Sequence, residues 1–72
     1  MKSSKLCPVP AHAEIAPVRA YAALLSSTLN KPFAVVTIPH GSAAHAMGYR
    51  YVSIPKAEVT DYLANGATLA IS

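Results

Sequence analysis

A short apolar run with a proline at each end constrains the fold of this chain more than any other feature. The residues from Phe33 to Ile38 read Phe-Ala-Val-Val-Thr-Ile and lie between Pro32 and Pro39. β-Branched residues favour strands, and proline, which has no backbone N–H, is confined to the ends and edges of sheets. Continuous apolarity is typical of a strand that is covered on both faces or central in its sheet. We therefore expect a strand over 33–38.

A helix of about 17–29 is expected before this strand. Pro17 suits a first helical turn, and Glu14 lies on the side where the helix dipole favours negative charge. Asn30 suits the C-terminal end, and Pro32 prevents continuation of the helix. The apolar residues that recur at helical spacing are Val18, Tyr21, Ala22, Leu25 and Leu29.

The segment 49–54 alternates with period two, as a half-exposed strand does. Val52 and Ile54 share one face of this strand and are expected in the core. Tyr49 and Tyr51 share the other face, so we expect both tyrosines to point outward.

A second helix is expected to begin at Pro55, and a last strand to cover 67–71. Proline is favoured in a first helical turn, and the pair Asn65-Gly66 supplies a left-handed stop at the other end. The apolar stripe of this helix consists of Val59, Tyr62 and Leu63.

In chain order these segments predict an α+β domain with helix, strand, strand, helix and strand, which is a small three-stranded sheet with two helices. Residues 1–13 show neither the helical nor the strand period of apolar residues, which predicts an extended N-terminal arm. The domain itself is therefore expected to cover 14–72. If the strands on either side of the second helix are parallel, their crossover should be right-handed. The first two strands either pair as a hairpin with a long loop or lie apart.

The length of the chain, 72 residues, allows one domain with a thin core. Although 53% of the residues are hydrophobic, 14 of these residues are alanine. Cores of this size rarely contribute more than about 3–5 kcal/mol, and small proteins often add disulfides, metals or partner subunits. A surface for a partner, or for a second copy of the chain, is therefore expected.

The single cysteine, Cys7, has no partner for an internal disulfide, which favours a reducing compartment and a cytoplasmic location. Lys2 and Lys5, with an Ala-His-Ala site at 11–13, resemble parts of a signal peptide. Prolines interrupt the segment that should be apolar, so we expect no signal peptide. No run approaches the ~18 apolar residues that span a bilayer, and no membrane partner is expected.

Cys7, His12, His40 and His45 are the candidates for soft metal ligands, with C-x4-H and H-x4-H spacing. Structural zinc sites typically use paired thiolates, which a single cysteine cannot supply. We therefore expect exposed loop histidines, with no metal and no cofactor.

Catalysis is not expected either. A hydroxyl or thiol nucleophile would need Ser42 or Cys7 beside His40 or His45, with a third group to orient the base. No G-x-S-x-G elbow is present. Glu58 and Asp61 lie on one helix face, not in the contrasting environments that acid–base catalysis requires. The sequence predicts no catalytic residue.

The loop 40–48 matches no phosphate-binding motif. Ser42 is expected to cap a single helical turn over 43–46, because a serine side chain accepts a hydrogen bond from the first turn of a helix. Such a loop would present His40 and His45 to a partner.

Aromatic and basic residues around the strand 49–54 are the strongest candidates for contact with a partner. Tyr and Arg are over-represented at interface hot spots, since they combine a large contact area with a polar end. The alternative is that the tyrosines pack beneath a helix or the N-terminal arm. The predicted partner-binding residues are Tyr49, Arg50, Tyr51, Lys56, His40 and His45.

These features predict a small regulatory protein, such as an inhibitor or adaptor, that docks on a protein partner. The net charge of +3 is scattered as ordinary solvated surface, and its sign favours an acidic partner. A nucleic-acid-binding accessory domain is the alternative, because tyrosines beside basic residues on a strand resemble base-stacking platforms. A small enzyme or metal-binding module ranks third, and a homodimer is compatible with each reading.

Overall fold

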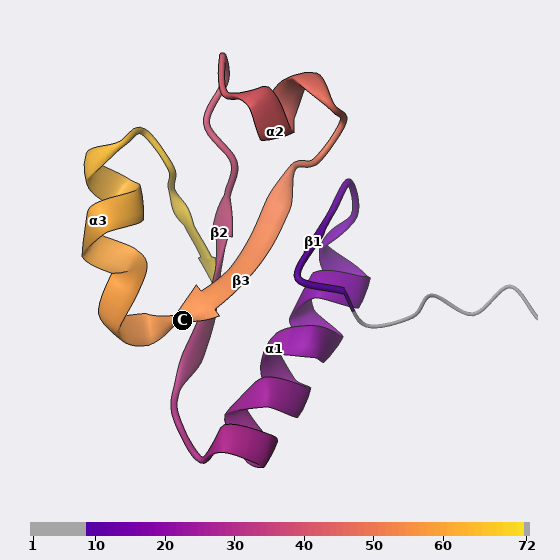
Figure 1. Ribbon diagram of the computed structural model, residues 1–72, viewed down its shortest axis with the longest axis vertical. Helices are drawn as coiled ribbons and strands as arrows, with labels where there is room; N and C mark the ends of the chain where they lie inside the picture. The colour runs from indigo at the N-terminus through magenta and orange to yellow at the C-terminus, as the bar shows by residue number, and fades with distance from the viewer. Residues whose placement is uncertain (1–8, 72) are drawn as a thin grey trace, which may run out of the picture.

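Four strands form one antiparallel sheet in the order β1-β3-β2-β4 in the computed structural model, which describes residues 9–71 (Figure 1). The strands are β1 at Ala11–His12, β2 at Phe33–Thr37, β3 at Tyr51–Pro55 and β4 at Leu69–Ile71. The predicted α+β class is confirmed.

The helices are α1 at Ile15–Leu29, the single turn α2 at Ala43–Ala46, and α3 at Val59–Ala64, which a 3-10 turn at Lys56–Glu58 precedes. The first helix begins two residues before the predicted start. Pro17 still lies in its first turn, where a missing N–H removes no intrahelical bond.

Asn30 ends α1, as predicted. Its backbone is left-handed, with φ of 56°, and its N–H donates to the carbonyl of Ser26. Asparagine tolerates this conformation better than most residues, and the hydrogen bond satisfies one carbonyl of the last turn. The chain then turns directly into β2.

β2 is the central strand of the sheet, as its apolarity predicts. It pairs with β3 on one side and with β4 on the other. Val35 and Val36 are both fully buried, although adjacent strand residues point to opposite faces. Both faces of β2 are therefore covered.

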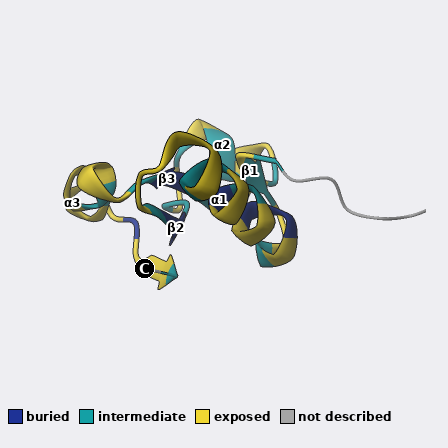
Figure 2. Cartoon of the chain, turned by 90° about the horizontal axis from the view of Figure 1, so that it is seen from below, coloured by how far each residue is buried: buried dark blue, intermediate teal, exposed yellow. Residues whose placement is uncertain are grey.

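The two larger helices cover opposite faces of the sheet (Figure 2). On one face, Val18 and Ala22 of α1 pack around Val35. On the other face, the cluster of Val36, Ile54 and Ala67 packs against Val52, Val59 and Tyr62. The sheet thus lies between two small hydrophobic clusters.

The predicted sheet was short by one strand. Residues 1–8 of the predicted arm lie outside the described residues, but Ala11 and His12 pair with Val52 and Tyr51 of β3. The N–H of Ser53 also donates to the carbonyl of Pro10, at 2.8 Å. A two-residue strand is too short to show a period, which is why periodicity did not reveal it.

The pairing of the first two predicted strands is now defined. β2 and β3 form an antiparallel hairpin, with residues 38–50 as its long connection. Because β2 is antiparallel to both β3 and β4, those two strands run parallel to each other with β2 between them. Among the described residues, no helix is long and apolar enough to cross a membrane.

We predict that Val36→Ala lowers the free energy of unfolding by about 2–3 kcal/mol, because it removes two methyl groups from a fully buried position. Urea denaturation followed by circular dichroism measures this loss. The control is Leu24→Ala, because Leu24 is 52% exposed and its truncation should change stability by less than about 0.5 kcal/mol. Equal losses in the two variants would contradict the central role of β2.

Candidate functional site

The connection between β2 and β3 is a structured loop. Ser42 caps α2, as predicted: its Oγ accepts a hydrogen bond from the N–H of His45 at 3.2 Å and donates one to the carbonyl of Pro39 at 2.8 Å. Gly41 and Gly48 flank the turn with φ of 86° and 101°, a region that side chains disfavour. The loop is thus held by its own side chains.

Arg50 fastens the other end of this loop. Its Nη1 donates to the carbonyl of His45 at 2.9 Å and to its neighbour, the carbonyl of Tyr49, at 3.0 Å. Its backbone N–H donates to His12, and its carbonyl accepts from Ile38. Between described residues, the guanidinium forms its hydrogen bonds through Nη1 alone. Arg50 therefore connects α2 to the beginning of β3. Its Nη2 and Nε donate to no other described residue.

A pocket of about 410 Å³ lies beside α2, where the loop meets the ends of the strands. Its polar residues come from β2, the loop, β3 and the segment before β4. They are Thr37, His40, His45, Arg50, Tyr51 and Thr68. No aspartate or glutamate is among the described residues that line it.

Two threonines form one polar wall of this pocket. Their Oγ1 atoms lie 2.7 Å apart, and the N–H of Thr68 donates to Oγ1 of Thr37 at 2.9 Å. The N–H of Thr37 in turn donates to the carbonyl of Thr68 at 2.8 Å. These bonds extend the pairing of β2 toward β4 and fix the position of both hydroxyl groups.

The two loop histidines stack on one another. The ring centroids of His40 and His45 lie 4.3 Å apart, with the planes tilted by 40°. Desolvation lowers the pKa of His45 below its ordinary value, and the positive charges of Arg50 and His40 lower this pKa further. The lowered pKa favours the neutral form of the His45 imidazole, which can donate or accept a hydrogen bond.

The expected outward position of Tyr51 is wrong. Its ring is half-buried and packs against the α1-side cluster of Val18, Ala22 and Val35. The alternation of β3 is real, but α1 covers the face that carries Tyr51 and Ser53, while α3 covers the opposite face. Tyr51 thus belongs to the core and lines the pocket as well.

Of the predicted partner-binding residues, His40, His45, Arg50 and Tyr51 line this one pocket. Tyr49, which is 38% exposed, directly precedes Arg50 in the chain. Lys56 lies just after the far end of β3. Because the strand between them is extended, Lys56 is roughly 20 Å from Arg50.

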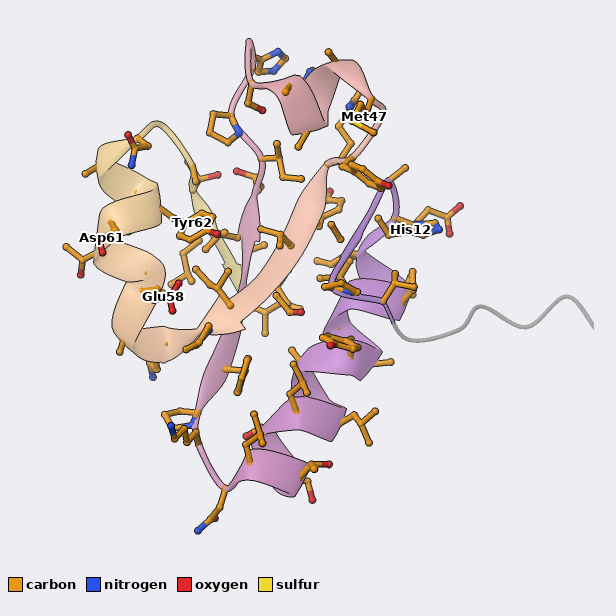
Figure 3. The ribbon with its side chains drawn as sticks, viewed as in Figure 1. His12, Met47, Glu58, Asp61 and Tyr62 are labelled. Carbon is orange, nitrogen blue, oxygen red and sulfur yellow. The ribbon has the colours of Figure 1, made fainter. Side chains whose placement is uncertain are left out.

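Sequence reasoning missed three residues of this region. Met47 is 73% exposed and lies next to α2 (Figure 3), where nothing in the local pattern distinguishes it from a core methionine. Thr37 and Thr68 are separated by many residues in the chain, and only the β2–β4 pairing brings their hydroxyls together. Asp61, by contrast, projects from α3 away from the sheet (Figure 3).

Within residues 9–71, no group of three His, Cys, Asp or Glu side chains could hold a metal ion. Nδ1 of His12 accepts a hydrogen bond from the N–H of Glu14 at 3.0 Å, so this histidine serves the turn before α1. Cys7, the other candidate ligand from the sequence, lies outside the described residues.

Ser42→Ala should loosen α2 by about 1 kcal/mol, because it removes the side-chain cap of the turn. Amide hydrogen exchange should speed up at His45 and Tyr49, whose N–H groups bond within the loop, and not at the centre of β2. Ser42→Thr, which keeps the hydroxyl, is the control. Unchanged exchange in Ser42→Ala would show that the cap does not hold the loop.

The pKa of His45 should lie below its ordinary value of about 6.5 in an NMR titration of the imidazole protons. The unfolded chain then binds more protons than the folded one as pH falls below this value, so the free energy of unfolding should decrease over that range. Arg50→Gln should raise the pKa of His45, because it removes one of the neighbouring positive charges. A pKa above the ordinary value would contradict this environment.

Comparisons with known proteins give no further guide to this pocket. No protein-family model matches the chain, and no significant match exists among curated proteins or solved structures.

Proposed function

We propose that this protein is a small, non-catalytic binding protein that docks on a protein partner through the surface around α2. We define this docking surface by His40, Met47, Tyr49 and Arg50. The observation that carries the proposal is the position of two exposed side chains, Met47 and Tyr49, in the same loop as a positively charged pocket. Met, Tyr and Arg are enriched at protein interfaces, where apolar anchors lie beside polar contacts.

The order of the loop also supports docking. Partners lose affinity when a flexible loop must become ordered on binding, so a loop held in advance binds at lower entropic cost. The cap by Ser42 and the two contacts of Arg50 Nη1 hold this loop in the free protein. It therefore resembles the preorganised loops of inhibitors and adaptors more than a segment that folds on contact.

The positions of the basic residues favour a protein partner over nucleic acid. Nucleic-acid-binding proteins usually gather Lys and Arg along one face. Among residues 9–71, Arg19 lies on α1, Lys31 follows that helix, and Arg50 and Lys56 lie at opposite ends of β3. Tyr51, one of the two rings that could stack on a base, packs against the α1-side cluster. An oligonucleotide that binds at low salt and is released steeply as salt rises would favour the nucleic-acid alternative.

We further propose that the protein acts in the cytoplasm. A single cysteine cannot form an internal disulfide, and small secreted domains usually depend on several. Because the core is thin, binding to a partner would also stabilise the folded chain.

A photocrosslinking residue in place of Met47 should capture the partner in the source cell, whereas the same residue in place of Leu24 on α1 should not. With the captured partner purified, Tyr49→Ala and Met47→Ala should each weaken binding by about 1–2 kcal/mol in calorimetry, as truncation of a hot spot does. Lys56→Ala is the control and should change binding by less than about 0.5 kcal/mol, since it lies far from α2. Equal crosslinking from both positions, or equal losses in all variants, would contradict this docking surface.

A further inference from the structure

We infer that the pocket beside α2 is a carboxylate-binding site, which receives an Asp or Glu side chain of the protein partner. This inference rests on the proposed function and deepens it, because it names the chemical group that the docking surface recognises. It is carried by the donors, the charge and the size of the pocket.

Arg50 supplies the donors for such a group. Its contacts with the carbonyls of His45 and Tyr49 are made by Nη1, which fixes the plane of the guanidinium. Nη2 and Nε make no hydrogen bond to another described residue, and the residue lines the pocket. A guanidinium edge of this kind matches the two oxygens of a carboxylate.

The charge of the pocket favours a carboxylate over a phosphoryl group. Arg50 provides one permanent positive charge, and no carboxylate of the described lining offsets it. Lys56 lies at the other end of β3 and cannot contribute a second charge. A phosphoryl group carries about 1.5–2 negative charges at neutral pH, whereas an Asp or Glu side chain carries one. His45 also lines the pocket, and its lowered pKa disfavours a second positive charge there.

The size of the pocket suits a side chain that enters from a partner. A volume of about 410 Å³ exceeds that of a carboxylate alone and leaves room for its methylene stem. The hydroxyls of Thr37 and Thr68 line the same pocket and provide further polar contacts. Met47 and Tyr49, outside the pocket, are placed to contact the surface from which the acidic side chain projects.

The test is an NMR titration of the 15N-labelled full chain with N-acetyl-glutamate N-methylamide at constant ionic strength. The glutamine analogue is the matched neutral probe, and inorganic phosphate is the alternative anion. Saturable shifts should appear at Thr68, His45 and the Arg50 side chain up to about 100 mM of the glutamate probe, since one side chain binds at best in the millimolar range. The pKa of His45 should rise when the probe is bound, because a negative charge favours the imidazolium.

Two variants with the same change in net charge separate the pocket from general electrostatics. Arg50→Gln should weaken binding of the glutamate probe about tenfold, as loss of a charged hydrogen-bond donor does. Lys56→Gln should leave it unchanged. Arg50→Lys, which keeps the charge but not the planar donor edge, should bind with intermediate affinity.

Several results would overturn the inference. These are the absence of saturable shifts in the wild-type protein, equal shifts with the glutamine analogue, equal losses in Arg50→Gln and Lys56→Gln, and tighter binding of phosphate than of the glutamate probe. If Arg50→Gln disturbs the loop, the wild-type shift map and Arg50→Lys still decide the question. A failure here, with Tyr49→Ala still weakening the partner complex, would remove the carboxylate site and leave the docking surface intact.

Discussion

Val35 and Val36 are neighbours on β2, yet each belongs to a different hydrophobic cluster, and each cluster holds one helix on the sheet. Neither α1 nor the short α3 could bury its apolar face without the strand between them. Because β2 also pairs with β3 and β4, its burial fixes the sheet order and the faces at the same time. β3, β4, α1 and α3 all contact this strand and are placed relative to it.

The long connection of the β2–β3 hairpin is ordered by polar contacts, not by a core of its own. Most loops of this length gain little from packing, so their backbone groups need local partners. Here Ser42 satisfies the start of α2, and Arg50 satisfies carbonyls at its end. The cationic side chain that holds the loop is also a wall of the pocket. Loop order and the charge of the pocket therefore depend on the same residue.

Much of the fold could be predicted from local signals in the sequence. The proline-bounded run predicted β2, Asn30 predicted the end of α1, and Ser42 predicted the cap of α2. The remaining features depend on contacts between distant segments. Alternation in β3 correctly divided its residues between two faces, but it could not show that α1 covers the face of Tyr51. The pocket could not be predicted from the sequence for the same reason, because Thr37 and Thr68 meet only through strand pairing.

The pocket beside α2 is assembled from segments that are distant in the chain: Ala13 before α1, the continuous stretch from the end of β2 to the start of β3, and the segment before β4. No fragment of the protein contains it, so a ligand there would bind the folded chain and not the unfolded one. By mass action, a ligand at one hundred times its dissociation constant adds about 2.7 kcal/mol to the free energy of unfolding. This gain is comparable with the stability that a core of this size supplies, which is about 3–5 kcal/mol. A chain with so small an interior would thus owe a large share of its resistance to unfolding and proteolysis to the complex in which it takes part.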